Sequence, residues 1–169
     1  KRLTDLCQGD SIIVLEAGRI GEGPAGRNSG FMIDLPHELA ADAYAGSADT
    51  DRKQITLNRH AQDFARSVAE EYDMPDEAVA SMGRVNGAVN ARGQAHNDDY
   101  AGKLDQLGES YQRLDATDMK AMTGSDFYRS GLFTPGAVML QPALYVRHLA
   151  AGLAIRGDRP VQIFESSPA

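Results

Sequence analysis

Residues 16–30, with the sequence EAGRIGEGPAGRNSG, combine carboxylates, arginines and glycines in one short stretch. Gly21, Gly23 and Gly26 have the spacing G-x-G-x-x-G. In dinucleotide-binding folds this motif leaves a strand and opens a helix, so that backbone N–H groups and the helix N-terminus meet a diphosphate. The preceding residues 11–15, SIIVL, form a continuous apolar run typical of a strand buried on both faces of a parallel sheet. The stretch therefore has the composition of a nucleotide-binding loop.

The literal motif does not meet the other requirements of that fingerprint. Five residues separate Leu15 from Gly21, whereas the first glycine of a fingerprint directly leaves its strand. The following GRNSGFMIDLP favours extended or irregular structure instead of a helix. Asp42, which lies at about the expected 20-residue distance for an acidic partner, is in LAADAYA and does not end a strand pattern. We interpret the three glycines as a chance match.

Glu16 supports a second alignment, in which residues 11–15 are the second strand of a nucleotide-binding unit. A carboxylate at the carboxyl end of that strand accepts hydrogen bonds from the adenosine ribose hydroxyls. Counting back about 20 residues from Glu16 ends just before Lys1. We therefore expect the true glycine fingerprint upstream of this chain, and residues 1–10 to be the end of the helix that it opens. The alternative is that Glu16 simply ends a strand in solvent.

The stretch VLEAGRIGEGPAGRNSGFM resembles the second strand and following loop of FAD-dependent oxidoreductases of the D-amino-acid oxidase and sarcosine/glycine oxidase superfamily, in particular the bacterial subgroup that includes γ-glutamylputrescine oxidase. The family pattern is a strand, Glu-Ala, a few residues with Gly, then small-Ser-Gly-Arg-Asn-small-Gly. Ala25 stands where Ser is usual. Residues 130–169 are similar to the family's later strand, helix and returning strand. The likeness is firm over 11–34 and 130–169 and looser between them.

The resemblance implies FAD as the cofactor and hydride transfer to it from the carbon of a C–N bond, with a small amine or amino acid as the substrate. By position, Glu16 would bind the ribose, and Gly26, Arg27, Asn28, Ser29 and Gly30 would follow the diphosphate toward the flavin. Ala17, Gly18 and Arg19 would line the adenine end, which Ala169 would reach from the returning strand.

No residue of the chain is assigned a catalytic role. Tyr128 and Arg129 have the chemistry of a clamp for a substrate carboxylate, but an edge-strand tyrosine and a solvated arginine would give the same pattern.

The remaining pattern predicts a mixed α/β fold: part of a Rossmann-like FAD- or NAD(P)-binding domain with part of a substrate domain. Apolar periodicity predicts a helix over 49–72, and further helices are expected over 91–107, 117–122 and 142–156, with strands over 83–91, 127–136 and 161–165. We expect a partial FAD-binding domain over 1–80, a partial substrate domain over 81–140, and a return to the FAD-binding domain over 141–169. The apolar stripe of the first helix consists of Leu57, Ala61, Phe64, Ala65, Val68, Ala69 and Tyr72.

The composition argues against several classes of function. A net charge of −7 without a local basic cluster disfavours nucleic-acid binding. No apolar run approaches the roughly 20 residues of a membrane span. Cys7 is the only cysteine, which excludes an internal disulfide and suits the cytoplasm. No metal site is expected, because the histidines have no metal-ligand spacing; they are His37, His60, His96 and His148.

Two other classes remain compatible with the residues. One is a nucleotide-free α/β binding or interaction domain whose glycine loop only crosses a sheet edge. The other is an NAD(P)-linked oxidoreductase, because Glu16 would suit the ribose of NAD equally well. The block Gly26–Gly30 disfavours the latter, since a simple NAD domain usually has a helix at this point.

Overall fold

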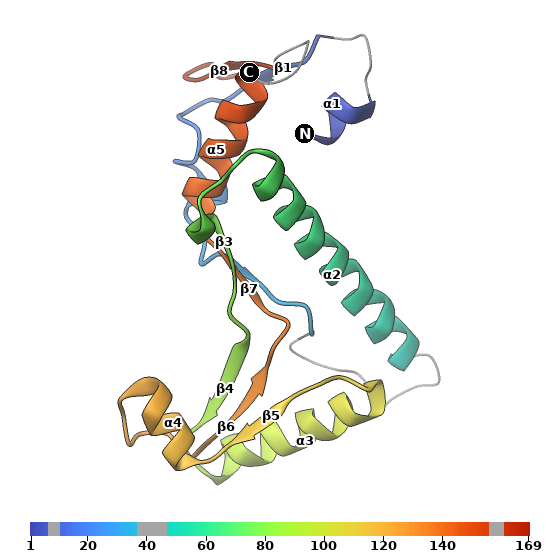
Figure 1. Ribbon diagram of the computed structural model, residues 1–169, viewed down its shortest axis with the longest axis vertical. Helices are drawn as coiled ribbons and strands as arrows, with labels where there is room; N and C mark the ends of the chain where they lie inside the picture. Colours follow the sequence, from blue (N-terminus) through green and yellow to red (C-terminus); the bar gives the residue numbers. More distant parts are fainter. Residues whose placement is uncertain (7–10, 37–46, 156–160) are drawn as a thin grey trace. The chain divides into compact units, whose positions relative to one another are not determined.

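The computed structural model describes residues 1–6, 11–36, 47–155 and 161–169, and within them one or two strands follow each α-helix along the chain (Figure 1). This confirms the predicted mixed α/β class. Cys7, His37 and Asp42 lie outside the described residues. The elements are α1 (Arg2–Leu6), β1 (Ile13–Leu15), the 3₁₀ turn η1 (Pro24–Gly26), β2 (Phe31–Met32), α2 (Ser47–Glu71), η2 (Asp76–Ala78), β3 (Val79–Ser81), β4 (Arg84–Ala88), α3 (Ala91–Leu107), β5 (Gln112–Leu114), α4 (Ala116–Thr123), β6 (Ser130–Thr134), β7 (Val138–Leu140), α5 (Pro142–Ile155) and β8 (Gln162–Phe164).

The chain forms two compact units, each made of separate segments. The first unit contains Lys1–Phe31, Asp63–Ala80 and Met139–Ala169, and the second contains Met32–Gln62 and Ser81–Val138. The division between them falls inside α2 and inside the sheet β2-β7-β3. Assigning cofactor and substrate roles to parts of the chain remains a prediction.

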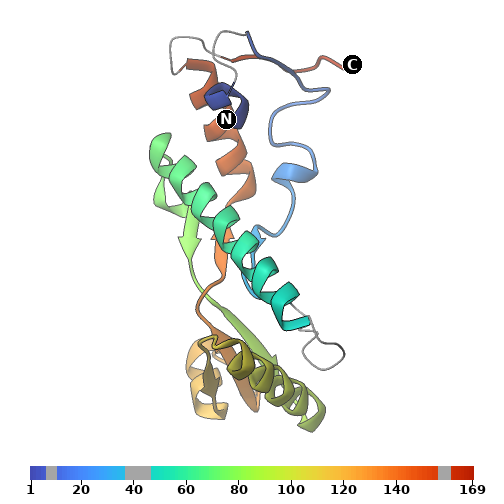
Figure 2. The same cartoon turned by 90° about the vertical axis from the view of Figure 1, so that its right-hand side faces the viewer.

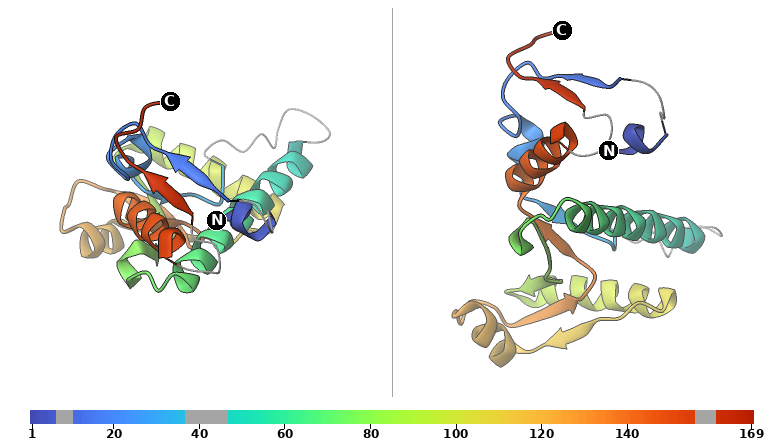
Figure 3. Two further views of the ribbon diagram at one scale, coloured as in Figure 1. Left: turned by 90° about the horizontal axis from the view of Figure 1, so that it is seen from above. Right: turned by 45° about the horizontal axis from the view of Figure 1, so that its top comes forward.

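In the first unit, β1 and β8 form a parallel pair, with Val14 opposite Ile163 (Figure 3). Parallel pairing places the carboxyl ends of both strands at one edge. Glu16, which follows β1, donates its backbone N–H to the Phe164 carbonyl at 2.9 Å. Helix α5 leads into β8, and the Val161 N–H donates to the Leu153 carbonyl at 2.9 Å. The strand pair thus carries Glu16 to an edge that is also reached by the end of the chain.

The prediction that residues 11–15 are buried on both faces is wrong for this chain. The side chains of β1 are exposed, with Ile13 at 56% and Leu15 at 54%. Parallel strands are buried when neighbouring strands and helices cover both edges and faces. Among the described residues only β8 pairs with β1, which explains the exposure.

Helix α2 confirms the predicted helix over 49–72 but buries a different stripe. Ala65 and Val68 are buried as expected, whereas Leu57 and Phe64 are 62% and 48% exposed. Ala61 is exposed as well. The other buried residues of α2 are Asp51, Ile55 and Gln62, so the buried face includes polar side chains.

Polar side chains fasten the middle of α2 to Met32, Asp34 and Gly136 within the second unit. Asn58 donates its side-chain amide to the Asp34 carbonyl at 2.9 Å. Gln62 donates to the carbonyls of Met32 at 2.8 Å and Gly136 at 2.9 Å. Arg59 pairs with the buried Asp34 carboxylate at 3.0 Å. Most of the buried polar groups on this face are therefore compensated by hydrogen bonds, although Asp34 Oδ1 and Asp51 Oδ2 are buried without a hydrogen-bond partner among the described residues.

The second unit is built around the antiparallel sheet β4-β6-β5, in which Asn86 is opposite Leu132. Helix α3 lies along one face of this sheet (Figure 2), and its Asn97 donates to the Asn86 carbonyl at 2.8 Å. Helix α3 begins and ends as predicted, between the N-cap Asn90 and Gly108, whose φ is 74°. The core of this unit combines residues of α3, β6, α2 and the segment after β2: Leu35, Ile55, Tyr100, Ala101, Leu104 and Leu132.

Candidate functional site

The carboxylate of Glu16 lies directly beyond the carboxyl end of β1, as the second alignment predicts. Its Oε1 accepts the Gly18 N–H at 2.8 Å, which fixes the side chain across a two-residue turn. No other group among the described residues hydrogen-bonds this carboxylate. Because a carboxylate has about four acceptor sites, Glu16 keeps the capacity to accept hydrogen bonds from a ligand hydroxyl.

The last part of the chain lies beside the same turn. The Ser167 N–H donates to the Glu16 carbonyl at 2.9 Å, and the Ser166 N–H donates to the Gly18 carbonyl at 2.8 Å. These bonds hold the segment that ends at Ala169 next to residues 16–18. The structure thus brings together two groups of predicted site residues that lie about 150 residues apart in the sequence.

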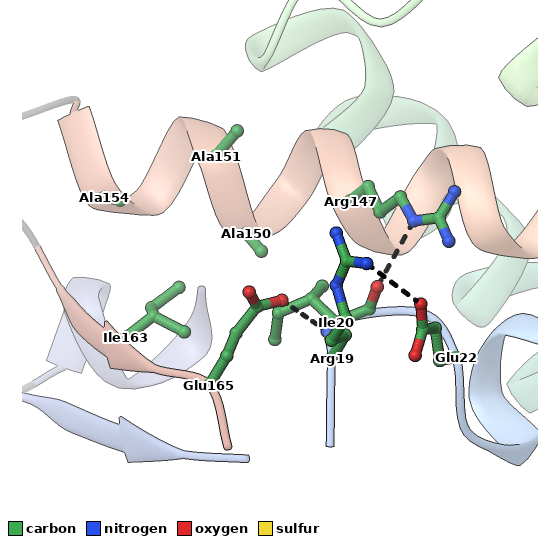
Figure 4. Close-up of a pocket in the computed structure, with 9 residues that line it drawn as sticks. All are labelled: Arg19, Ile20, Glu22, Arg147, Ala150, Ala151, Ala154, Ile163 and Glu165. Atoms are coloured by element: carbon green, nitrogen blue, oxygen red, sulfur yellow. Dashed lines mark hydrogen bonds and ion pairs between the residues drawn. The ribbon is translucent and has the colours of Figure 1, made fainter. Parts of the chain in front are cut away.

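The beginning of the glycine loop is fastened through the peptide groups of Ile20. Its N–H donates to Glu165 Oε1 at 2.6 Å, and its carbonyl accepts from Arg147 Nε at 3.2 Å (Figure 4). Glu165 follows β8 and Arg147 is on α5, so strand and helix both hold the loop. Sequence reasoning missed Arg147 and Glu165 because their contacts join residues 127 and 145 positions apart.

The literal motif forms a closed turn and no α-helix begins in it. Gly21 has a φ of +77°, in the left-handed region that favours glycine. A Cβ on Gly26 would lie 2.0 Å from the Gly21 carbonyl oxygen, so the loop folds tightly onto itself there. The residues between them include only the single 3₁₀ turn η1. This agrees with the interpretation of the glycine spacing as a chance match.

Asn28 and Gly30 fix the far end of the loop. Asn28 Nδ2 donates to the carbonyls of Ala25 at 2.9 Å and Pro24 at 3.2 Å, and its Oδ1 accepts the Gly30 N–H at 2.9 Å. Gly30 is buried with a φ of +75°, and a Cβ there would lie 2.1 Å from the Leu140 carbonyl oxygen. The Leu140 N–H donates to the Gly30 carbonyl at 2.8 Å, which ties the loop to β7.

The exposed face of the loop carries two arginines with different surroundings. Arg19 is 3.7 Å from Glu22, an exposed contact that contributes little. Arg27 is exposed and has no ion-pair partner among the described residues. Arg27 is therefore the guanidinium that is available to a diphosphate.

Most of the predicted site residues are accessible. Glu16 and Gly26 are half-buried and Gly30 is buried, while the exposed residues are Ala17, Gly18, Arg19, Arg27, Asn28, Ser29 and Ala169. A carboxylate for ribose hydroxyls, an unpaired guanidinium for the diphosphate and a tight small-residue loop together fit one side of a dinucleotide. The residues present therefore fit FAD.

A cavity of about 630 Å³ adjoins the beginning of the loop, between residues 19–22, α5 and β8 (Figure 4). Its lining combines small or branched apolar side chains with two guanidinium groups and two carboxylates. The lining residues are Arg19, Ile20, Glu22, Arg147, Ala150, Ala151, Ala154, Ile163 and Glu165.

The possible carboxylate clamp, Tyr128 and Arg129, belongs to the second unit. Tyr128 packs against the backbone of Gly87, where a Cβ would lie 2.7 Å from its ring. Arg129 lines a cavity of about 360 Å³ together with several carboxylates, among them Asp115 and Asp118. The two side chains thus have separate surroundings.

Neither a metal site nor a membrane span is found in the described ranges. No group of three or more His, Cys, Asp or Glu residues there could hold a metal ion. No helix there combines the length and the apolarity that crossing a bilayer requires.

Comparison with known proteins identifies the family. The sequence pattern of the DAO family, described as FAD dependent oxidoreductase, matches residues 3–169. The chain is 31% identical over 175 residues to the probable oxidoreductase OrdL of Haemophilus influenzae, covering 95% of this chain and 37% of that protein.

Solved structures share the fold. Glycine oxidase from Bacillus cereus has a TM-score of 0.70 at 14% identity, over 94% of this chain and 40% of that chain. L-proline dehydrogenase from P. horikoshii has a TM-score of 0.66 at 12% identity, over 95% of this chain and 38% of that chain. The chain thus spans about two fifths of the length of these relatives. Because the family pattern covers nearly all of its residues, the chain belongs to the family of FAD-dependent oxidoreductases.

Proposed function

We propose that this chain is part of a flavoenzyme that oxidises the C–N bond of an amine or amino acid. The observation that carries the proposal is the position of Glu16 beyond β1, followed by a fastened loop that presents Arg27. Membership of the FAD-dependent family supports it. Relatives of the same fold include a glycine oxidase, an L-proline dehydrogenase and an L-amino acid deaminase, all of which are named for substrates with a C–N bond.

When bound, FAD would supply the redox chemistry as acceptor of a hydride from the substrate carbon next to nitrogen; the substrate would be left as an iminium ion, which loses a proton to give an imine that water hydrolyses. The residues of this chain would bind the cofactor and orient it. Glu16 would accept hydrogen bonds from the ribose hydroxyls, and Arg27 would place positive charge beside the diphosphate. The contacts of Ile20 and Asn28 would keep the loop in a binding shape before the cofactor arrives.

We further propose that the activity belongs to a longer polypeptide, of the length of the relatives. Such a polypeptide would supply the strand–G-x-G-x-x-G–helix unit that pairs with β1, and the substrate pocket. The exposed side chains of β1 support this, because they lack the layers that normally cover a parallel strand. A single cysteine suits the reducing cytoplasm, which we propose as the compartment.

The test is to purify the longer polypeptide and mix it with candidate amines and amino acids without oxygen. We expect a yellow protein whose visible flavin band bleaches with at least one of these substrates and does not bleach with the corresponding hydroxy acids, which lack the C–N bond. A protein that bleaches only with hydroxy acids would overturn the substrate class. A colourless protein that takes up no FAD would overturn the cofactor assignment.

A further inference from the structure

Both polar atoms of the Asn28 side-chain amide form hydrogen bonds inside the loop. An amide has two N–H donors and one carbonyl acceptor. Its Nδ2 donates to the carbonyls of Pro24 and Ala25, at 3.2 and 2.9 Å, and its Oδ1 accepts the Gly30 N–H at 2.9 Å. Both polar atoms of the side chain are thus engaged by the loop itself.

We propose that Asn28 is a positioning residue of the FAD site, which holds Arg27 and Ser29 in place and does not itself bind the diphosphate through its side chain. This inference rests on the proposed function and changes the role that the family resemblance implies for Asn28.

The geometry of the turn supports this role. The three hydrogen bonds of Asn28 join the 3₁₀ turn before it to the peptide of Gly30 after it. Arg27 and Ser29 lie between these fixed points, and both are exposed. The Arg27 N–H also donates to the Pro24 carbonyl at 3.2 Å, so the backbone that carries the guanidinium is held from two directions.

We call the three hydrogen bonds of Asn28 the clamp, and Gly30 holds one end of it in a fixed position. Its Cα lies so close to the chain at Leu140 that a Cβ would be 2.1 Å from the Leu140 carbonyl oxygen. A loop that is bound at Gly30 and at Ile20, and cross-linked by Asn28 between them, has little conformational freedom left to lose. A ligand that binds such a loop meets a lower ordering cost, which increases affinity without an additional contact.

The chemistry of the amide explains why an aspartate would not replace Asn28. A carboxylate at this position would keep an acceptor for the Gly30 N–H but would have no donor for the two carbonyls, and its negative charge would face their oxygens. We therefore expect Asn28→Asp to open the loop at least as much as Asn28→Ala, although it keeps the size and shape of the side chain.

The test compares Asn28 with its neighbour Arg27 in the longer polypeptide. The variants are Asn28→Ala, Asn28→Asp and Arg27→Gln, with Ser29→Ala as the control that leaves the clamp intact. Two quantities are measured: the dissociation constant for FAD at several salt concentrations, and hydrogen exchange of the loop amides in the apoprotein. Exchange needs no cofactor, so it reports on the clamp even if FAD does not bind.

Asn28→Ala and Asn28→Asp should each weaken FAD binding about tenfold or more and speed exchange of the Gly30 amide. Asn28→Ala, which changes no charge, should also leave the salt dependence of binding unchanged. Arg27→Gln should weaken binding and reduce the salt dependence, because a screened charge contact is lost, while exchange stays as in the wild type. Ser29→Ala should leave the exchange unchanged.

Wild-type affinity in both Asn28 variants would overturn the positioning role, as would weaker binding with unchanged exchange, since that result assigns Asn28 a direct contact. A wild-type protein that binds no FAD while Asn28→Ala still speeds exchange would overturn the proposed function and leave the clamp standing.

Discussion

Replacing Gly30 by alanine is the sharpest structural test of the loop. Gly30 has a φ of +75°, and its added Cβ would lie 2.1 Å from the Leu140 carbonyl oxygen and 3.2 Å from Pro142 Cδ. Forcing an alanine into the left-handed region costs roughly 1–2 kcal/mol. Moving the backbone away from Leu140 breaks a hydrogen bond worth about 1 kcal/mol and disturbs packing at a cost of about 1–3 kcal/mol. We expect Gly30→Ala to lower the free energy of unfolding by about 3–6 kcal/mol.

The measurement is urea unfolding of the apoprotein, followed by circular dichroism, for the wild type and two variants. Gly23→Ala is the matched control: it lies in the same loop, and an added Cβ would have no heavy atom within 4 Å. We expect its effect to be within about 0.5 kcal/mol, as for an ordinary surface substitution. Equal effects of Gly30→Ala and Gly23→Ala would refute the close approach of the loop to β7.

Three further predictions concern the rest of the chain. Gly102→Ala should raise the free energy of unfolding by about 0.5–1 kcal/mol in thermal or urea unfolding, because Gly102 is inside α3 and an added Cβ has open space; a loss of stability would contradict the described surroundings. Burial raises the pKa of Tyr145 above its ordinary value of 10.0. The unfolded chain therefore releases this proton first, and the free energy of unfolding falls as the pH rises above about 10. Tyr145→Phe should reduce that slope in urea unfolding at several pH values, and an unchanged slope would contradict the burial. The isolated 169-residue chain should bind FAD with a dissociation constant well above micromolar in calorimetric titration, because half of the diphosphate site is expected upstream; micromolar binding would show that this expectation is wrong.

Elements with strong local signals could be predicted from the sequence. Helix α3 has the expected bounds because its ends are determined locally: Asn90 Oδ1 accepts the Gly93 N–H at 2.9 Å, and Gly108 adopts the left-handed conformation that ends the helix. Helix α4 is similarly delimited by the capping box of Asp115 and by Gly124, whose φ is 72°. Such signals lie within a few residues of the element that they determine.

The buried face of α2 could not be predicted in the same way. Periodicity identifies an apolar stripe, but the face that is buried depends on partners far away in the sequence. Gln62 is buried because it bonds to carbonyls 30 and 74 residues away. The helix therefore turns the face that contains Gln62 inward, and Leu57 is left exposed. The short strands β2, β3 and β7 likewise lack a recognisable pattern, because they have only two or three residues each.

The residues of the candidate site differ in the same way: some follow from a local sequence pattern and others from contacts between distant residues. Glu16 and the loop that contains Arg27 are contiguous, so their residue types and spacing identify them in the sequence. Arg147 and Glu165 hydrogen-bond to the backbone of Ile20, which is 127 and 145 residues away in the sequence. A local sequence pattern cannot predict contacts of this kind. The role of Asn28 is also conformational: its residue type suggests ligand binding, and only the hydrogen bonds reveal the clamp.

The most direct measurement of the central claim is a titration of FAD into the longer apoprotein, for the wild type and for Glu16→Gln, followed by flavin fluorescence. The glutamine keeps an oxygen for the Gly18 N–H but loses the charge that strengthens hydrogen bonds from ribose hydroxyls. Such bonds are worth about 1.5–3 kcal/mol, so we expect one FAD per chain in the wild type and binding weakened about 10- to 100-fold in Glu16→Gln. Glu22→Gln, in the same loop, should bind as the wild type does. An apoprotein that binds no FAD, or a Glu16→Gln variant that binds it as tightly as the wild type, would contradict the account.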